Sequence, residues 1–207
     1  MLRRKISLTE DPLLKFNRYA SLQDELQLLD SSDFQVEHYL FFRQSMLSDL
    51  PSTQLPVSMR YRRNVPLLTY FQELNEHIHD FMEYKAQVTT INTTAKDILS
   101  CPQGVCQDYT HLMLDVLCSQ QIPARYVSGY LNQGKDFTGA ARMHAWVEAC
   151  VPGPGWLGLD PTNRRLVDHH YIKVAVGLDY EDYSPLRGHI KPAGINCTDH
   201  NVQVVEQ

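Results

Sequence analysis

Four apolar segments between residues 124 and 180 constrain the fold of this chain more than any other feature. They are 124–131 (ARYVSGYL), 142–151 (RMHAWVEACV), 155–160 (GWLGLD) and 171–180 (YIKVAVGLDY), and glycine-containing turns separate the first three. Segments of this length and composition, bounded by Gly and Pro, are typical of β-strands. Short turns favour antiparallel neighbours, with PGPG closing a hairpin between the second and third segments. The sequence therefore predicts an antiparallel sheet in the C-terminal half.

Helical patterns precede these strands. A helix within residues 65–84 is indicated by apolar residues that recur at steps of four and three: Leu67, Phe71, Leu74, Ile78 and Phe81. A short helix is predicted from Thr94, because Thr94 and Asp97 resemble a capping box. A third helix begins at or near Cys106 and ends before Pro123; its apolar stripe is Tyr109, Leu112, Met113, Val116 and Leu117. Helices followed by strands predict an α+β fold.

The N-terminal residues 1–62 give a weaker pattern. Short alternating or apolar runs such as ELQLLD and FQVEHYLFF are separated by clusters of Ser, Asp and Pro. This pattern predicts a few short strands joined by turns.

Composition excludes several classes of function. The chain has 207 residues, of which 43% are hydrophobic and 21% charged, as expected of a soluble globular protein. A net charge of -5 without a basic cluster argues against a nucleic-acid partner. No apolar run approaches the ~18 residues of a membrane helix, so we expect no membrane partner. The odd number of five cysteines and the lack of a signal-peptide pattern predict reduced thiols and a cytoplasmic protein.

Cys106 lies where a sulfur can react. It follows Gly104-Val105 and opens the third helix, where the positive end of the helix dipole and unpaired N–H groups favour thiolate over thiol. Its own N–H is placed to stabilise an oxyanion formed by attack at the sulfur. By itself, this segment equally fits an inert residue at a helix start. A zinc site with Cys101 and His111 is not expected, since C-x4-C-x4-H matches no common structural pattern.

His144 and Asp160 supply the missing partners. Along 142–151 the period of two places His144 on the same face as Trp146, Glu148 and Cys150. If PGPG closes a hairpin, Asp160 lies near residues 144–147 and within reach of the imidazole. A nucleophile, a base and a group that orients the base are what nucleophilic catalysis requires.

These segments resemble the transglutaminase-like superfamily, and within it a bacterial branch described as cysteine proteases. The likeness covers about residues 65–188 and rests on FMEYKAQVTTINTTAKDIL, GVCQDYTHLM, IPARYVSGYL, MHAWVEACVPGPGWLGLDPTN and IKVAVGLDY. It implies a papain-like core within 63–188, with Cys106 as nucleophile, His144 as general base and then acid, and Asp160 orienting the imidazole. It also implies that 1–62 is a short β-rich region lacking its first part, and that 189–207 is a C-terminal segment adding one more strand.

The expected chemistry is cleavage of an amide or peptide bond through a Cys106 thioester, with a protein or peptide as substrate. Two alternatives remain open: a transglutaminase that passes the acyl group to an amine, and a non-catalytic interaction module. Gln107 stands where animal crosslinking enzymes of the superfamily have Trp, so their acceptor specificity does not carry over. We see no calcium loop of their type, and we expect no cofactor and no metal ion.

Nearby polar residues receive more modest roles. Asp108 in the first helical turn is expected to stabilise the helix, and His111 to be packed or hydrogen-bonded. The tryptophans Trp146 and Trp156 fit either the core or a cleft wall. His169 and His170 are expected in a solvated turn.

Overall fold

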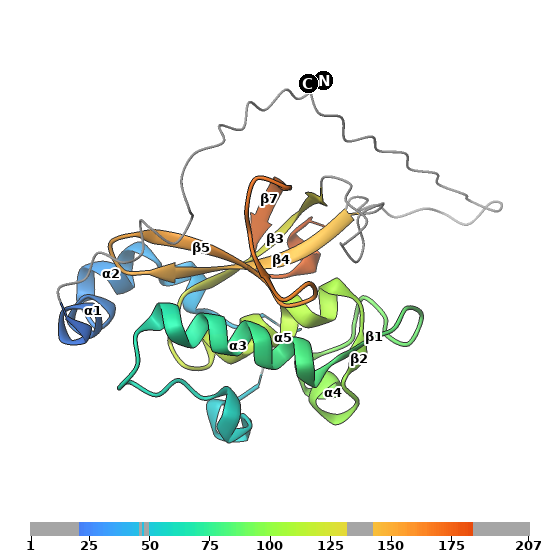
Figure 1. The fold of residues 1–207 in the computed structure, drawn as a ribbon, viewed down its shortest axis with the longest axis horizontal. Helices are drawn as coiled ribbons and strands as arrows, with labels where there is room; N and C mark the ends of the chain where they lie inside the picture. Colours follow the sequence, from blue (N-terminus) through green and yellow to red (C-terminus); the bar gives the residue numbers. More distant parts are fainter. Residues whose placement is uncertain (1–20, 46, 48–49, 132–142, 184–207) are drawn as a thin grey trace.

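The protein is described here from a computed structural model that covers residues 21–45, 47, 50–131 and 143–183. A five-stranded antiparallel sheet has the order β6-β5-β4-β3-β7 (Figure 1). Its strands are β3 (Ala124–Leu131), β4 (Met143–Val151), β5 (Gly155–Asp160), β6 (Arg165–Leu166) and β7 (Tyr171–Gly177). The four predicted strands are confirmed within a few residues at their ends, and β6 is an addition. The α+β prediction is confirmed.

Two helices, α3 (Leu67–Phe81) and α5 (Cys106–Cys118), pack on the sheet, and a third, α4 (Ala95–Ser100), packs against α5; all three are at predicted positions. Thr94 caps α4 through the predicted capping box with Asp97. Every residue of α5 from Asp108 to Cys118 is buried, because the helix lies between the sheet on one side and α3 and α4 on the other. Helix α5 is therefore buried on all sides from Asp108 onward, and not only along the apolar stripe that its periodicity predicts.

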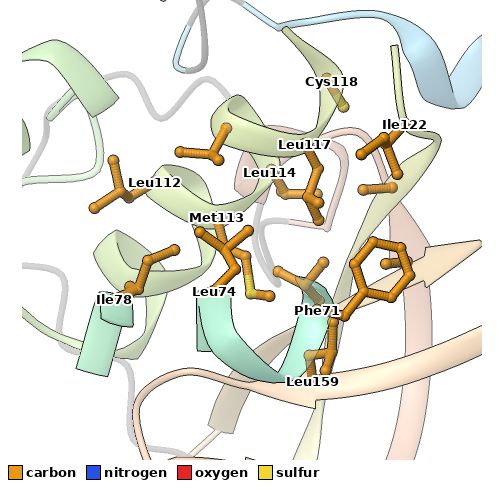
Figure 2. Close-up of a cluster of buried hydrophobic side chains, with 14 of the residues drawn as sticks. Phe71, Leu74, Ile78, Leu112, Met113, Leu114, Leu117, Cys118, Ile122 and Leu159 are labelled. Atoms are coloured by element: carbon orange, nitrogen blue, oxygen red, sulfur yellow. The ribbon is translucent and has the colours of Figure 1, made fainter. Parts of the chain in front are cut away.

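An apolar core joins α3, α5 and the sheet. Figure 2 shows Phe71, Leu74 and Ile78 of α3 in contact range of the apolar side chains of α5, with Leu159 of β5 beneath them. All four of these residues are at most 2% exposed. Each such side chain stabilises the fold by about 1.5–3 kcal/mol when removed from water. Helix α5 is thus held rigidly against β4.

The β4–β5 hairpin has the predicted register. Val151 pairs with Gly155 next to the turn and Val147 pairs with Leu159, which brings Asp160 level with Trp146. The turn uses Gly153 and Gly155 at φ 84° and 94°, a left-handed backbone that residues with a Cβ rarely adopt.

The strands predicted in residues 1–62 are wrong for the part the structure describes. Residues 21–45, 47 and 50–62 instead contain α1 (Leu22–Leu29), α2 (Ser32–Glu37) and 3₁₀ helices at Tyr39–Phe42, Ser52–Gln54 and Val57–Met59. Side-chain caps favour helix here, since Ser21 accepts a hydrogen bond from the Asp24 N–H and Ser31 accepts one from the Phe34 N–H.

Hydrogen bonds and ring contacts attach this helical segment to the core, and two of them illustrate how. Glu25 of α1 accepts a hydrogen bond from the Leu67 N–H at the start of α3, at 2.6 Å. His38 stacks on Trp156 of β5, with ring centroids 5.5 Å apart.

A short parallel pair, absent from the prediction, precedes α5. Strand β1 (Glu83–Tyr84) pairs with β2 (Gln103–Gly104), so that Tyr84 lies opposite Gly104. A further 3₁₀ helix follows β7 at Tyr180–Tyr183. Residues 132–142, Cys197 and the strand expected near the C-terminus lie outside the described residues. Among the helices described, none has the length and apolar character that crossing a membrane requires.

Candidate active site

Cys106 is the first residue of α5 and the most distinctive of the described thiols. Val105 before it is extended (φ -111°, ψ -177°), so the helix begins at Cys106 as predicted. Cys106 is half-buried, whereas Cys118 and Cys150 are fully enclosed. Burial raises the pKa of each of these two enclosed thiols to about 12. They are therefore poor nucleophiles, and Cys106 keeps an open side.

Asp108 holds the start of α5 in place. Its Oδ2 accepts hydrogen bonds of 2.7 Å from both the Val105 N–H and the Thr89 hydroxyl. A Cβ on Gly104 would lie 2.4 Å from the same oxygen, so only glycine permits this close approach. Burial raises the pKa of Asp108 despite these hydrogen bonds. Gly104 therefore serves to admit the carboxylate, in addition to leaving the sulfur unshielded.

His144 of β4 and Asp160 of β5 form a buried pair between these two neighbouring strands. The distance between His144 Nε2 and Asp160 Oδ2 is 2.7 Å, and both side chains are 0% exposed. The hairpin alone creates this pair, because its register places Asp160 beside the His144 face of β4. The predicted juxtaposition of these two residues is confirmed.

The Cys106 side chain is close enough to the His144 imidazole to influence its charge. The second ring nitrogen, Nδ1, is buried and has no hydrogen-bond partner among the described residues. Burial by itself lowers the pKa of His144, but the hydrogen bond to Asp160 and the contact with Cys106 outweigh it and raise the pKa to about 10. The arrangement favours an imidazolium between a carboxylate and the sulfur. Cys106, His144 and Asp160 are thus brought together; their catalytic roles remain predictions.

Asp160 is held by residues that the sequence reasoning missed. Its Oδ1 accepts hydrogen bonds from the Thr162 and Asn163 N–H groups, at 3.0 and 3.2 Å. Its Oδ2 accepts from Asn163 Nδ2 at 2.7 Å and from the Tyr171 hydroxyl at 2.8 Å, in addition to His144. Burial raises the pKa of Asp160, and the hydrogen bonds with His144, Asn163 and Tyr171 reverse this effect and hold it below the ordinary value of 3.8.

His111, Trp146, Trp156 and Tyr84 lie in different surroundings. His111 is fully buried and Nε2 accepts a hydrogen bond from the Tyr180 N–H at 3.3 Å; burial lowers its pKa to about 4. Trp146 lies in the core 6.2 Å from the His144 ring, and Trp156 is half-buried at the far end of β5. Tyr84 is 44% exposed on β1, the strand that pairs with β2.

One group in the described part of the chain has the composition of a metal site. Ligand atoms of Asp168, His169 and His170 lie within 4.8 Å of one another on the loop before β7. His170 Nδ1 and Asp168 Oδ1 are 3.0 Å apart, and His169 is exposed. The group is separate from Cys106, so the candidate reaction centre itself consists of a thiol, an imidazole and carboxylate oxygens.

Comparison with known proteins agrees with this geometry. The profile of the transglutaminase-like superfamily matches residues 60–161, a range that contains all three candidate residues. This part of the chain therefore belongs to the transglutaminase-like superfamily, as the sequence resemblance predicted. A crystal structure from Cytophaga hutchinsonii, of a protein provisionally named a cysteine protease, superposes with a TM-score of 0.61 at 26% identity, over 78% of this chain and 54% of that one.

Several curated proteins are similar in sequence. An uncharacterized protein of Mycobacterium tuberculosis H37Rv is 41% identical over 150 residues, which are 68% of this chain and 48% of that protein. An uncharacterized protein of Mycobacterium leprae is 40% identical over 127 residues, 59% of this chain and 45% of that one. The chain thus spans about half the length of these relatives. A protein-glutamine gamma-glutamyltransferase of Pseudomonas aeruginosa is 42% identical over 67 residues, 28% of this chain and 10% of that enzyme.

Proposed function

We propose that this chain is a thiol-dependent acyl-transfer enzyme that cleaves amide or peptide bonds through a thioester on Cys106. The observation that carries the proposal is the buried His144–Asp160 pair, whose Nδ1 has no hydrogen-bond partner in the described part of the chain and whose imidazole lies within the influence of the Cys106 side chain at the start of α5. Nucleophilic catalysis requires a base at the nucleophile and a third group that orients the base. The substrate is a protein or a peptide, because the chemistry acts on a carboxamide.

In the first half of the reaction, the Cys106 sulfur attacks the substrate carbonyl carbon while His144 holds the thiol proton on Nδ1. The oxyanion accepts a hydrogen bond from the Cys106 N–H, one of the donors that the first helical turn leaves unpaired. When the C–N bond breaks, His144 gives the Nδ1 proton to the departing amine. Asp160 keeps the Nε2–H bond throughout and so fixes the ring orientation.

The second half of the reaction releases the acyl group. Water loses a proton to His144 Nδ1 and adds to the thioester carbonyl, the C–S bond breaks, and the sulfur leaves as a thiolate beside the imidazolium. The products are a carboxylic acid and the free enzyme. If an amine takes the place of water, the same steps give a new amide. The short similarity to the Pseudomonas gamma-glutamyltransferase supports this second outcome.

Selective labelling tests the reactivity of Cys106. Of the described thiols, Cys101 is exposed and would compete, so a Cys101→Ser, Cys197→Ser background isolates Cys106 from both it and the cysteine outside the described residues. We expect iodoacetamide to label Cys106 at least ~10-fold faster than a free cysteine at pH 6.5, with the rate dropping in His144→Ala. Equal rates for Cys106 and free cysteine at this pH would contradict the proposal.

Turnover is measured with a library of peptide amides and glutamine-containing peptides, with and without a labelled amine. We expect Cys106→Ala to lower turnover by more than ~10³-fold, while Cys101→Ala, which removes an exposed thiol nearby in the sequence, leaves it unchanged. Acid or ammonia release without amine incorporation indicates a hydrolase, and incorporation indicates a transglutaminase. Full turnover by a folded Cys106→Ala variant rules out both.

A further inference from the structure

The carboxylate of Asp160 receives more donors than orientation of an imidazole requires. One oxygen, Oδ2, accepts from His144, from Asn163 Nδ2 at 2.7 Å and from the Tyr171 hydroxyl at 2.8 Å. The other oxygen is occupied by two backbone N–H groups. A carboxylate has about four acceptor positions in total, so the three donors on Oδ2 compete for the same electron density.

Tyr171 reaches this oxygen from across the sheet. It is the first residue of β7, which is separated from β5 by β4 and β3 in the strand order. Its ring packs edge-on against Trp146, with centroids 5.3 Å apart, and lies 6.3 Å from the His144 ring. Tyr171 is only 5% exposed. This packing places the hydroxyl where it donates to Asp160 Oδ2.

Burial and nearby carboxylates keep the Tyr171 hydroxyl protonated. Burial has the largest effect, and Asp160 and Asp168 add to it; together they raise the pKa of the phenol well above its ordinary value, and Arg165 opposes them weakly. His144 faces the same oxygen from β4, and Cys106 acts on that imidazole as well. Across any working pH, Tyr171 therefore remains a neutral donor and never exchanges its proton with the substrate.

We infer that Tyr171 is a positioning residue that limits how strongly Asp160 holds the His144 proton, by drawing charge from Oδ2. The inference rests on the acid–base role that the proposed function gives to His144. An imidazolium held by an uncompensated buried carboxylate is a weak acid, and a weak acid protonates the departing amine slowly. The hydroxyl of Tyr171 keeps His144 a stronger acid than the pair alone would allow, while the Asn163 amide and the backbone donors keep the carboxylate in place.

The test is an NMR titration of His144 in ¹⁵N-histidine-labelled protein. In Tyr171→Phe the ring still packs against Trp146, and Oδ2 loses one neutral donor. We expect the pKa of His144 to rise by about one unit, because a hydrogen bond to a charged group is worth about that much. Site-specific 3-fluorotyrosine at position 171 keeps ring and hydroxyl but donates more strongly, and is expected to lower the pKa of His144. Shifts of opposite sign cannot come from a purely structural role.

Tyr70→Phe is the matched control. Tyr70 also donates a buried hydrogen bond of 2.8 Å, but to the Met59 carbonyl at the opposite side of the core. We expect it to lower stability without moving the His144 titration. An unchanged or lowered pKa of His144 in folded Tyr171→Phe overturns the inference. A raised pKa of His144 in the fluorinated protein overturns it as well. The fluorinated protein keeps the ring and the hydroxyl, so this second test stands even if the Phe variant does not fold. This readout needs no turnover, so an inactive wild-type protein would refute the proposed function and leave the Tyr171 result to be judged separately.

Discussion

Replacing Gly104 by alanine should destabilise the start of α5. A Cβ at this position would lie 2.4 Å from Asp108 Oδ2 and 2.6 Å from Asp108 Cβ and Cγ, whereas Cβ contacts shorter than 3.0 Å are essentially never observed. The carboxylate is buried and its Oδ2 already accepts two hydrogen bonds of 2.7 Å, so it cannot move aside without losing them. An alanine side chain at position 104 would therefore displace the Asp108 carboxylate and break its hydrogen bonds with the Val105 N–H and the Thr89 hydroxyl.

The size of the effect follows from those bonds. A hydrogen bond to a charged buried group contributes about 1.5–3 kcal/mol, and the loss of a helix cap costs about 1 kcal/mol. We expect Gly104→Ala to lower the free energy of unfolding by about 3 kcal/mol, measured by urea denaturation. Because Cys106 follows this turn directly, its alkylation rate should fall as well.

A double-mutant cycle isolates the cause. Asp108→Ala removes Cγ and Oδ2 but keeps Cβ, which would still lie 2.6 Å from the new Cβ, so Gly104→Ala in that background should cost clearly less than the about 3 kcal/mol expected in the wild-type background, without becoming neutral. Equal costs in the two backgrounds, or a cost below about 0.5 kcal/mol in the wild-type background, would refute this account of Gly104.

The remaining predictions concern charge pairs. Asp160→Asn removes the charge opposite a buried imidazole and should lower the free energy of unfolding by about 3–5 kcal/mol and the pKa of His144 with it. Since the folded pKa of His144 is raised from 6.5 to about 10 and that of Asp160 is lowered from 3.8, the pair stabilises fully between about pH 4 and 6.5. The stabilisation by this pair is lost as pH rises through 10 or falls below 3.8. The free energies of unfolding of wild type and Asp160→Asn, measured by urea denaturation, should therefore converge at pH 11. A difference that stays constant with pH would contradict this. Glu148→Gln weakens hydrogen bonds of 2.8 and 2.6 Å from Arg125 in a largely buried pair and should cost about 2 kcal/mol. The exposed Glu73→Gln should change stability by less than about 0.5 kcal/mol, and similar losses for the two would show that burial does not set the scale.

The parts of the site that the sequence predicts are local ones. Period-two alternation gives the face of His144, and PGPG gives the hairpin register that brings Asp160 beside it. The turn that begins at Asp160 also fits its sequence, since Oδ1 accepts from the next two available N–H groups while Oδ2 serves His144. The two roles considered for Asp160, turn residue and imidazole partner, are filled by different oxygens of one side chain.

The parts that were missed depend on contacts between distant segments. Tyr171 reaches Asp160 only because β7 joins the opposite edge of the sheet, and nothing in its local sequence indicates this. Thr89 meets Asp108 through the loop that leaves β1, which the sequence does not place.

The error in the N-terminal segment has a different origin. Short apolar runs do not distinguish strand from helix by periodicity alone. Ser21 with Asp24, and Ser31 before Phe34, were available as helix-start signals, and the side-chain caps they form decide the outcome.

The hairpin that carries His144 and Asp160 has a consequence for how the chain is assembled. The two residues are separated by only 16 positions, so their pairing requires nothing beyond one tight reversal of the backbone. Cys106 belongs to a helix that must dock onto that hairpin through the apolar layer between them. His144 and Asp160 therefore lie within a single β-hairpin, and Cys106 joins them only when helix α5 packs onto the sheet. A change that loosens α5 from β4 should therefore separate Cys106 from the His144–Asp160 pair and abolish the proposed reaction, while the hairpin and the helix each keep their own structure.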